Sequence, residues 1–280
     1  MTTPPYLLLD IPAEDYHAAT KRNEYTTSHR LHLFRRCPAL YKKTIDGRIV
    51  EGDTAAFELG RATHTLILEG EDRFAAEYIV SDGPINPKTG NPYGRATKAY
   101  AEWAETQTLH AVSSADHALI LEMSAAVHAH PVAADLVASG LAEATIRAEW
   151  NGEPVQSRLD WFDPDRNILL DLKTCADIDR FRFDVRDFGY VEQMAFYARL
   201  LEIAGGISAR SLNVFLVAVE KKEPFRVAVV NIVSPTIDDA NHQHMGGENW
   251  RDDNDAMFAE LKTCREQDVW PTRYEKPILI

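Results

Sequence analysis

The sequence has few cysteines, no long apolar run and no excess of positive charge. Its three cysteines, Cys37, Cys175 and Cys264, lie far apart in a chain of 280 residues. An odd and scattered set predicts reduced thiols, and it argues against a disulfide framework or a CxxC metal knuckle. No apolar run approaches the roughly 20 residues of a membrane helix. The first residues, MTTPPYLLLDIP, lack the basic start of a signal peptide, so we expect a cytoplasmic protein.

The charge balance is acidic, with 30 Lys and Arg against 43 Asp and Glu, a net charge of −13. Binding to nucleic acid phosphates normally needs a basic surface, so this balance counts against a DNA-binding protein. It still permits a local basic channel, and carboxylates that bind metal would add to the negative charge. The hydrophobic fraction of 45% and the charged fraction of 26% are ordinary for a globular protein.

The first half of the chain has helical patterns. TTSHRLHLFRRCPALYKKTI predicts a helix that Thr27 or Ser28 caps and Pro38 ends or kinks. This segment holds the densest group of basic residues, which forms either a solvated helix face or an edge that contacts phosphates. TAAFELGRATHTLILEG predicts a second helix ended by Gly70. Residues 81–97 are rich in Pro, Gly and Asn and predict a long irregular loop, and helical patterns then fill residues 98–139.

From Ala142 onward the apolar period changes to two, which predicts strands. ATIRAEW, PVQSRLDWF and NILLDLKT are successive strands, GYVEQMAFYARLLEIAGG is a helix, and LNVFLVAVE with FRVAVVNIV forms a further hairpin. Ser234 would cap a last helix that has Pro235 at its first position. The order predicts an α/β fold, a mixed sheet flanked by helices. We expect one domain over 1–280, with a helical part at 16–140, a sheet core at 141–233 and a C-terminal helix at 234–265.

The hairpin SRLDWFDPDRNILLDLKT carries the residues most suited to chemistry. Asp171 and Lys173 are two apart on a strand, so their side chains leave the same face. A turn near 164–166 puts Asp160 opposite Leu170 or Asp171, to within one residue. Two neighbouring carboxylates repel each other unless a cation neutralises them. With an ammonium beside them, they suit a divalent metal, a scissile phosphate and an attacking water.

The metal should be a hard ion. Carboxylate oxygens, together with the Leu172 carbonyl, favour Mg²⁺ or Mn²⁺ over zinc. The alternative is a solvated hairpin whose charges simply face water. Ile168, Leu169, Leu170 and Leu172 surround Asp171 in the sequence, which indicates a strand covered on both faces, where an unpaired carboxylate would be costly.

Two helices add polar side chains at helical spacing. Gly60 and His64 are four apart, so Gly60 would let the backbone approach the sheet while His64 points to the metal. Gln193 and Tyr197 also share a face of their helix. Taken singly, each could be an ordinary core or surface residue. Glu143 is a further candidate ligand that the pattern leaves open.

The ordered set G-x-x-x-H (Gly60, His64), D (Asp160), D-x-K (Asp171, Lys173) and Q-x-x-x-Y (Gln193, Tyr197) resembles the RecB-like branch of the PD-(D/E)XK nucleases. The leading segment with Ser28, Leu31 and CPALY is similar to that branch's N-terminal helix. The placement of the motifs is closest to the RecE-type exonucleases, also called exodeoxyribonuclease VIII. The resemblance covers about Tyr16 to Gly205.

This resemblance implies a Mg²⁺-dependent enzyme, with Mn²⁺ as an alternative, that degrades linear double-stranded DNA from its ends in the 5′-to-3′ direction. The product is a 3′ single strand for an annealing protein in recombination, and a homo-oligomer is implied too. By resemblance, His64, Asp160 and Asp171 would bind the metal, Lys173 would activate or orient water, and Gln193 with Tyr197 would support the site. Three scattered cysteines argue against the iron–sulfur cluster of some relatives. The residues expected to contact DNA are Ser28, Arg35, Arg36, Arg61, Arg95 and Lys98.

Three other functions stay open. The fold could bind DNA or protein without cleaving it, although retained carboxylates and lysine argue against a silent site. An endonuclease of restriction or repair type would also use these residues, but it would cut closed circles. An acidic adaptor protein would explain the charge and leave the ordered site unexplained.

Overall fold

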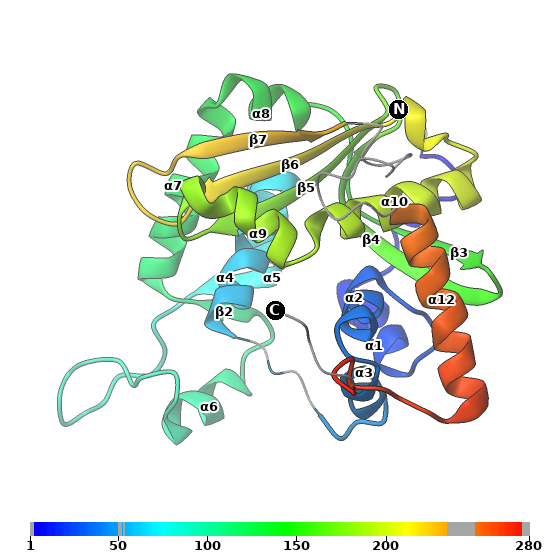
Figure 1. Ribbon diagram of the computed structural model, residues 1–280. Helices are drawn as coiled ribbons and strands as arrows, with labels where there is room; N and C mark the ends of the chain where they lie inside the picture. The colour runs from blue at the N-terminus through cyan, green and yellow to red at the C-terminus, as the bar shows by residue number, and fades with distance from the viewer. Residues whose placement is uncertain (1–2, 50–51, 53, 234–249, 276–280) are drawn as a thin grey trace.

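The computed structural model describes residues 3–49, 52, 54–233 and 250–275, and a five-stranded sheet forms its centre (Figure 1). The strand order is β3-β4-β5-β6-β7, and only β5 and β6 run parallel. The sheet is therefore mixed and flanked by helices, as the sequence predicts. The strands are β3 (Leu141–Trp150), β4 (Glu153–Asp163), β5 (Ile168–Cys175), β6 (Asn213–Glu220) and β7 (Val227–Ile232).

Helices cover both faces of this sheet. The first part of the chain supplies α1 (Ala13–Lys21), α2 (Ser28–Arg36), α3 (Pro38–Ile45), α4 (Ala55–His64), α5 (Glu71–Glu77), α6 (Lys98–Ala104), α7 (Ser114–Ala129) and α8 (Pro131–Leu136). The later part supplies α9 (Phe181–Asp187), α10 (Tyr190–Gly205) and α12 (Trp250–Gln267), with short 3₁₀ turns η2 (Ile178–Arg180) and η3 (Ala209–Ser211). In the described part of the chain, no helix is both long and apolar enough to cross a membrane.

Two clusters of buried side chains lie on opposite faces of the sheet. The first cluster packs α2, α10 and α12 on the strands, and the second packs α4, α7 and α8 on them. Alternation along β3 explains the first: Ala144, Ile146 and Trp150 point to one face and are buried, as their period of two predicts. The Trp150 ring meets Phe196 of α10 at 5.4 Å and Phe258 of α12 at 5.0 Å between ring centroids.

Most predicted helix ends are confirmed. The Thr27 hydroxyl accepts a hydrogen bond from the Arg30 backbone N–H and caps α2, and Pro38 begins α3 after a break at Cys37. Gly206 ends α10 in the left-handed conformation, at φ 67°. The predicted start of the last helix at Ser234 and Pro235 lies outside the described residues, and α12 ends at Gln267, not at 265.

The helix that carries His64 widens directly after it. α4 continues into a π-helical turn, η1 (Thr65–Glu69), which Gly70 closes at φ 89°. A π-turn holds one residue more than an α-helical turn and commonly occurs at functional sites. The sequence predicts this helix and its end at Gly70, but it gives no sign of the wide turn.

The sequence predicts helices throughout residues 98–139, and this prediction is wrong at one point. A short strand, β2 (His110–Val112), interrupts it and pairs in parallel with β1 (Tyr78–Val80). Three-residue strands are too short to show a period of two, so neither strand is predictable from the sequence. Residues 81–97 do form the predicted irregular loop, and its two arms join at a single bridge between Ile85 and Pro92.

Candidate metal centre

The centre of the site is the place where β4 and β5 separate. Their backbones pair at three positions, of which Trp161 opposite Leu170 is the last. The next position in this register puts Asp160 beside Asp171, within the one-residue range predicted from the sequence. Beyond it a side chain takes over the pairing, because the Leu172 backbone N–H donates to Asp160 Oδ2 at 2.9 Å.

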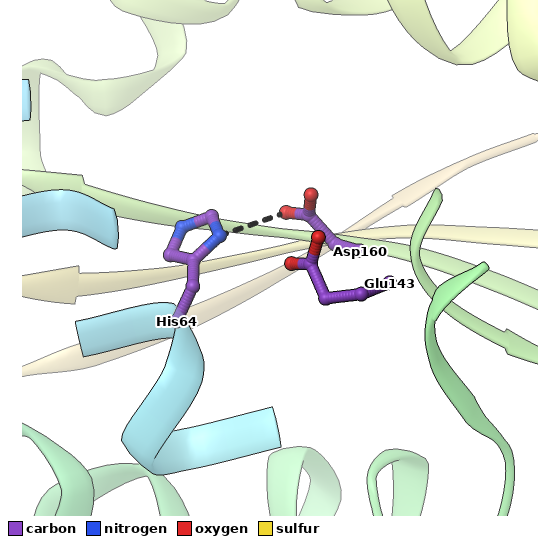
Figure 2. Close-up of side chains that lie close together, drawn as sticks. All are labelled: His64, Glu143 and Asp160. Atoms are coloured by element: carbon purple, nitrogen blue, oxygen red, sulfur yellow. Dashed lines mark ion pairs between the residues drawn. The ribbon is translucent and has the colours of Figure 1, made fainter. Parts of the chain in front are cut away.

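His64 and Glu143 meet Asp160 from two directions (Figure 2). His64 Nδ1 lies 3.3 Å from Asp160 Oδ2, and one ligand atom of each of these three residues lies within 4.8 Å of the others. Glu143 reaches this place because its neighbours in β3 pair with Trp161 and Leu159, which leaves it opposite Asp160. Its own backbone is left-handed, at φ 54°. Three acids therefore occupy one row across β3, β4 and β5.

Asp171 and Lys173 contact each other beside this group, on the shared face that their spacing predicts. Lys173 Nζ lies 2.6 Å from Asp171 Oδ2, and the Asp171 side chain is buried. Gln193 links the pair to α10: its amide donates to Asp171 Oδ1 at 3.1 Å, and its carbonyl accepts from Lys173 Nζ at 3.2 Å. The same amide donates to the Tyr197 hydroxyl at 2.7 Å. The structure thus joins four of the five predicted catalytic residues, Asp171, Lys173, Gln193 and Tyr197, in one hydrogen-bonded group next to Asp160.

Burial and mutual repulsion change the ionisation of the acids. Burial, followed by the charge of Asp171, raises the pKa of Asp160 well above its usual value. Burial also raises the pKa of Glu143. For Lys173 burial lowers the pKa, but the neighbouring charges of Asp171 and Asp160 outweigh it and raise the pKa overall. Lys173 is therefore an ammonium at neutral pH.

His64 is neutral in this environment. Burial lowers the pKa of His64 to about 4, although the charge of Asp171 and a hydrogen bond with the Leu172 carbonyl act in the opposite direction. A neutral imidazole is the form that binds a metal. The same contact places the Leu172 carbonyl, a predicted ligand, next to the His64 ring. At Gly60 an added β-carbon would lie 4.0 Å from Thr174 Oγ1, so the approach of α4 to the sheet does not itself require glycine.

The donor set fits a hard divalent cation. Possible metal-ligand atoms converge from the His64 imidazole and from two largely buried carboxylates, those of Asp160 and Glu143. The Asp171 carboxylate lies alongside them. A buried acid whose pKa is raised by a like charge is stabilised in its ionised form when a cation neutralises that charge. Oxygen-rich donors favour Mg²⁺ or Mn²⁺. These residues can therefore hold a divalent metal.

Two residues that have no role in the motif set also support this group. Arg158 pairs with the Glu143 carboxylate, and it donates to the Ile11 carbonyl at 2.8 Å. The Tyr190 ring lies under Lys173, with Nζ 4.5 Å from the ring centroid. Tyr190 stands three residues before Gln193 on the same helix, and this spacing was a usable sign. For Arg158 the only sign was its position two residues before Asp160.

The six residues predicted to contact DNA are spread over α2, α4, α6 and the loop before α6. Arg95 pairs with Glu58 at 3.0 Å, Lys98 with Glu102 at 3.3 Å, and Arg35 donates to Asn254 at 2.8 Å. The other three are Ser28, the first residue of α2, and the exposed Arg36 and Arg61. Their contact with DNA stays a prediction.

Comparison with known proteins agrees with this geometry. A family model described as a PDDEXK-like domain of unknown function (DUF3799) matches residues 28–277. The chain belongs to this PDDEXK-like family. The solved structure of a protein from Eubacterium rectale, described as a "Putative exonuclease", shares its fold with a TM-score of 0.66, at 15% sequence identity over 98% of this chain and 96% of that one. No curated protein matches the chain in sequence.

Proposed function

We propose that this PDDEXK-like chain is a magnesium-dependent deoxyribonuclease that hydrolyses phosphodiester bonds at the ends of linear double-stranded DNA. The observation that carries the proposal is the convergence of Asp160, Asp171 and Lys173, with His64 beside them, where β4 and β5 separate. Paired acids and an ammonium in a largely buried place suit hydrolysis of a phosphodiester, which is itself negatively charged.

Each residue of the group has a distinct task in this reaction. His64 and Asp160 would hold the metal, with Glu143, Asp171 and the Leu172 carbonyl as the remaining candidate donors. A bound Mg²⁺ would supply a water of lowered pKa and charge stabilisation for the phosphate. Lys173, as an ammonium, would orient the attacking water and stabilise negative charge on the phosphate. Gln193 fixes both Asp171 and Lys173 through its two hydrogen bonds.

The finer proposal is a RecE-type exonuclease. It is supported by the ordered motif set and by the fold shared with the Eubacterium rectale protein that is described as a "Putative exonuclease". Digestion would run 5′ to 3′ and leave a 3′ single strand for an annealing protein, and copies of the chain would assemble around the DNA. Mn²⁺ would replace Mg²⁺ in the same oxygen-rich set.

Labelled substrates test this proposal. The purified chain is incubated with linear duplex labelled at either the 5′ or the 3′ end, and with a covalently closed circle, in Mg²⁺, Mn²⁺ or EDTA. We expect release of short 5′-labelled products from linear DNA in both metals, an intact circle, and no products in EDTA. Cutting of the circle would indicate an endonuclease. If linear DNA stays intact in both metals, the chain is a module that binds DNA or protein without cleaving it.

A further inference from the structure

The junction of α9 and α10 exposes aromatic side chains next to the metal centre. Phe188 is 60% exposed and Phe183 is 38% exposed, in a segment that reads RFRFDVRDFGY. Exposed phenylalanine is costly in water, and several such rings among arginines are typical of surfaces on which nucleobases stack. Figure 1 shows this junction in front of the sheet, between α4 and α10.

Two successive ring contacts connect Phe188 with the predicted catalytic lysine. The centroids of Phe188 and Tyr190 are 5.8 Å apart, with their planes inclined by 35°, and Tyr190 carries Lys173 Nζ at 4.5 Å from its centroid. Gly189 makes this arrangement possible, because it turns the chain in the left-handed conformation at φ 67°. Tyr190 is covered in part by Lys173, so Phe188 presents the open ring at the surface.

The charges around these rings favour a polyanion. Residues 180–190 carry three arginines against two aspartates, and two of the acids nearby are engaged: Arg226 binds Asp179 at 3.0 Å, and Arg186 binds Asp187 at 2.8 Å. Arg180 and Arg182 are exposed, and neither forms an ion pair with a residue that the structure describes. Arg182 lies over the Phe183 ring, with its guanidinium carbon 4.7 Å from the centroid. An arginine in this position can contact a phosphate while the neighbouring ring contacts a base.

We propose that Phe188, backed by Tyr190, is a stacking platform for an unpaired nucleobase at the end of the DNA strand that enters the metal centre, with Arg180 and Arg182 beside its phosphates. This inference rests on the proposed nuclease function and adds a substrate feature to it: the enzyme holds a separated end, not a fully paired one. Stacking on one ring accepts any base, so the platform acts without sequence preference.

Binding of tailed duplexes tests the platform independently of cleavage. The probe is a fluorescein-labelled duplex with a four-nucleotide single-stranded tail, compared with the same duplex carrying an abasic tail, in Ca²⁺ with intact DNA verified on a gel. The wild-type chain is expected to prefer the base-bearing tail by roughly 5- to 150-fold, the range for one stacked base. F188A should remove this preference and F188W should restore it.

Matched variants distinguish base stacking on Phe188 from the loss of any exposed aromatic residue, from the loss of apolar surface and from a loss of the fold. Tyr274 is also an exposed aromatic residue, at 71%, and Y274A should keep the wild-type preference. F188L keeps an apolar side chain without a ring and should behave as F188A. Thermal unfolding of each variant verifies its fold. Equal wild-type affinity for both tails, no wild-type binding, or an unchanged preference in F188A each overturns the platform.

Cleavage in Mg²⁺ distinguishes the two proposals. A wild-type chain that prefers base-bearing tails but never digests DNA contradicts the nuclease and leaves the platform as a binding site. A wild-type chain that digests linear DNA but binds both tails equally contradicts the platform alone.

Discussion

Asp160 Oδ2 takes the place of a backbone carbonyl for the Leu172 N–H, at 2.9 Å, at the point where β4 and β5 stop pairing. One carboxylate therefore both holds the two strands together and offers a ligand to a metal. The strands separate at this point, and the acids of β3, β4 and β5 with the imidazole of α4 fill the space. Changes at Asp160 should therefore affect stability and metal binding in separable ways.

Replacement of Asp160 should abolish stabilisation by metal. For wild-type protein, Mg²⁺ or Mn²⁺ at about a hundred times its Kd should raise the free energy of unfolding by about 2.7 kcal/mol. Asp160→Asn and Asp160→Ala should both lose this gain, because the charged ligand is gone. Thermal melts with and without EDTA measure it.

The two variants should differ without metal. Asparagine keeps an oxygen that accepts from the Leu172 N–H and removes a charge that repels Asp171, so Asp160→Asn should be at least as stable as wild type in EDTA. Alanine leaves that N–H unpaired, which costs about 1–3 kcal/mol. Equal stability of the two variants would contradict the structural role of the carboxylate.

Asp171→Ala and Lys173→Ala should each reduce DNA digestion by at least about 10²-fold, because each removes a charge that acts on the metal, the water or the phosphate. Rates are measured on linear duplex in Mg²⁺. Lys262→Ala, on the exposed face of α12, is the control for loss of a positive charge. Unchanged digestion by either site variant would count against the site.

Glu143 and Arg158 form a largely buried ion pair beside the metal ligands, with side chains 20% and 14% exposed. Arg158→Met leaves the Glu143 carboxylate without its partner and should reduce the free energy of unfolding by about 3 kcal/mol. Adding Glu143→Gln to this variant should recover part of the loss. Chemical denaturation in EDTA measures both steps of this double-mutant comparison.

Glu143→Gln alone decides whether Glu143 is a metal ligand. If it is, the variant should need a higher Mg²⁺ concentration for the same thermal stabilisation, while its stability in EDTA changes less than that of Arg158→Met. An unaltered metal dependence would assign Glu143 to the ion pair alone.

Acid should weaken the fold through Glu220. Hydrogen bonds from Arg226 to both carboxylate oxygens, at 2.8 and 3.0 Å, lower the pKa of Glu220 from 4.5 to about 2. A lowered pKa gives stability that is complete above about pH 4.5 and is lost as the pH falls toward 2. Glu220→Gln should be less stable than wild type at neutral pH and should change less between pH 4.5 and 2. Urea midpoints across this range measure the difference, and parallel curves would contradict it.

Gly189→Ala should destabilise the chain by more than the cost of its left-handed backbone. That conformation costs a non-glycine residue about 1–2 kcal/mol. At Gly189 the new β-carbon would also lie 2.6 Å from His32 Nδ1 of α2. Gly206→Ala is the matched control, since Gly206 has the same φ of 67° and no atom within 4 Å of the added carbon. Thermal melts should place Gly189→Ala below Gly206→Ala, and equal values would exclude the contact with α2.

The sequence was sufficient for the sheet core because β3 alternates apolar residues at a period of two, while β5 and β6 are short, nearly continuous apolar runs that are buried on both faces. The turn residues between β4 and β5 also set the hairpin register, so Asp160 could be placed opposite Leu170 or Asp171, to within one residue. The positions of Gln193 and Lys173 followed from regular periods of four and two. These are local rules, and the fold obeys them at these residues.

The remaining features depend on contacts between distant segments. Glu143 stands in a strand whose period gives it an outward face, yet a left-handed backbone at φ 54° brings it to the metal group. β1 and β2 exist because each pairs with the other across 29 intervening residues. The partnership of Arg158 with Glu143 depends on the pairing of β3 with β4 and on the Ile11 carbonyl that also binds Arg158, which no local pattern shows.

The wide turn η1 lets one continuous helical segment meet two demands. Directly before it, the rotation about the helix axis is fixed because His64 must face Asp160; within it, Leu66, Ile67 and Leu68 must all enter the second core cluster. In an unbroken α-helix each residue advances by about 100°, so these orientations would be locked in one phase. The additional residue in the π-helical turn changes the rotation about the helix axis, so the residues of the turn need not keep the orientation that His64 sets. Deleting any one residue of Thr65–Glu69 should therefore misdirect either the imidazole or the apolar side chains, so the length of this segment matters more than its composition.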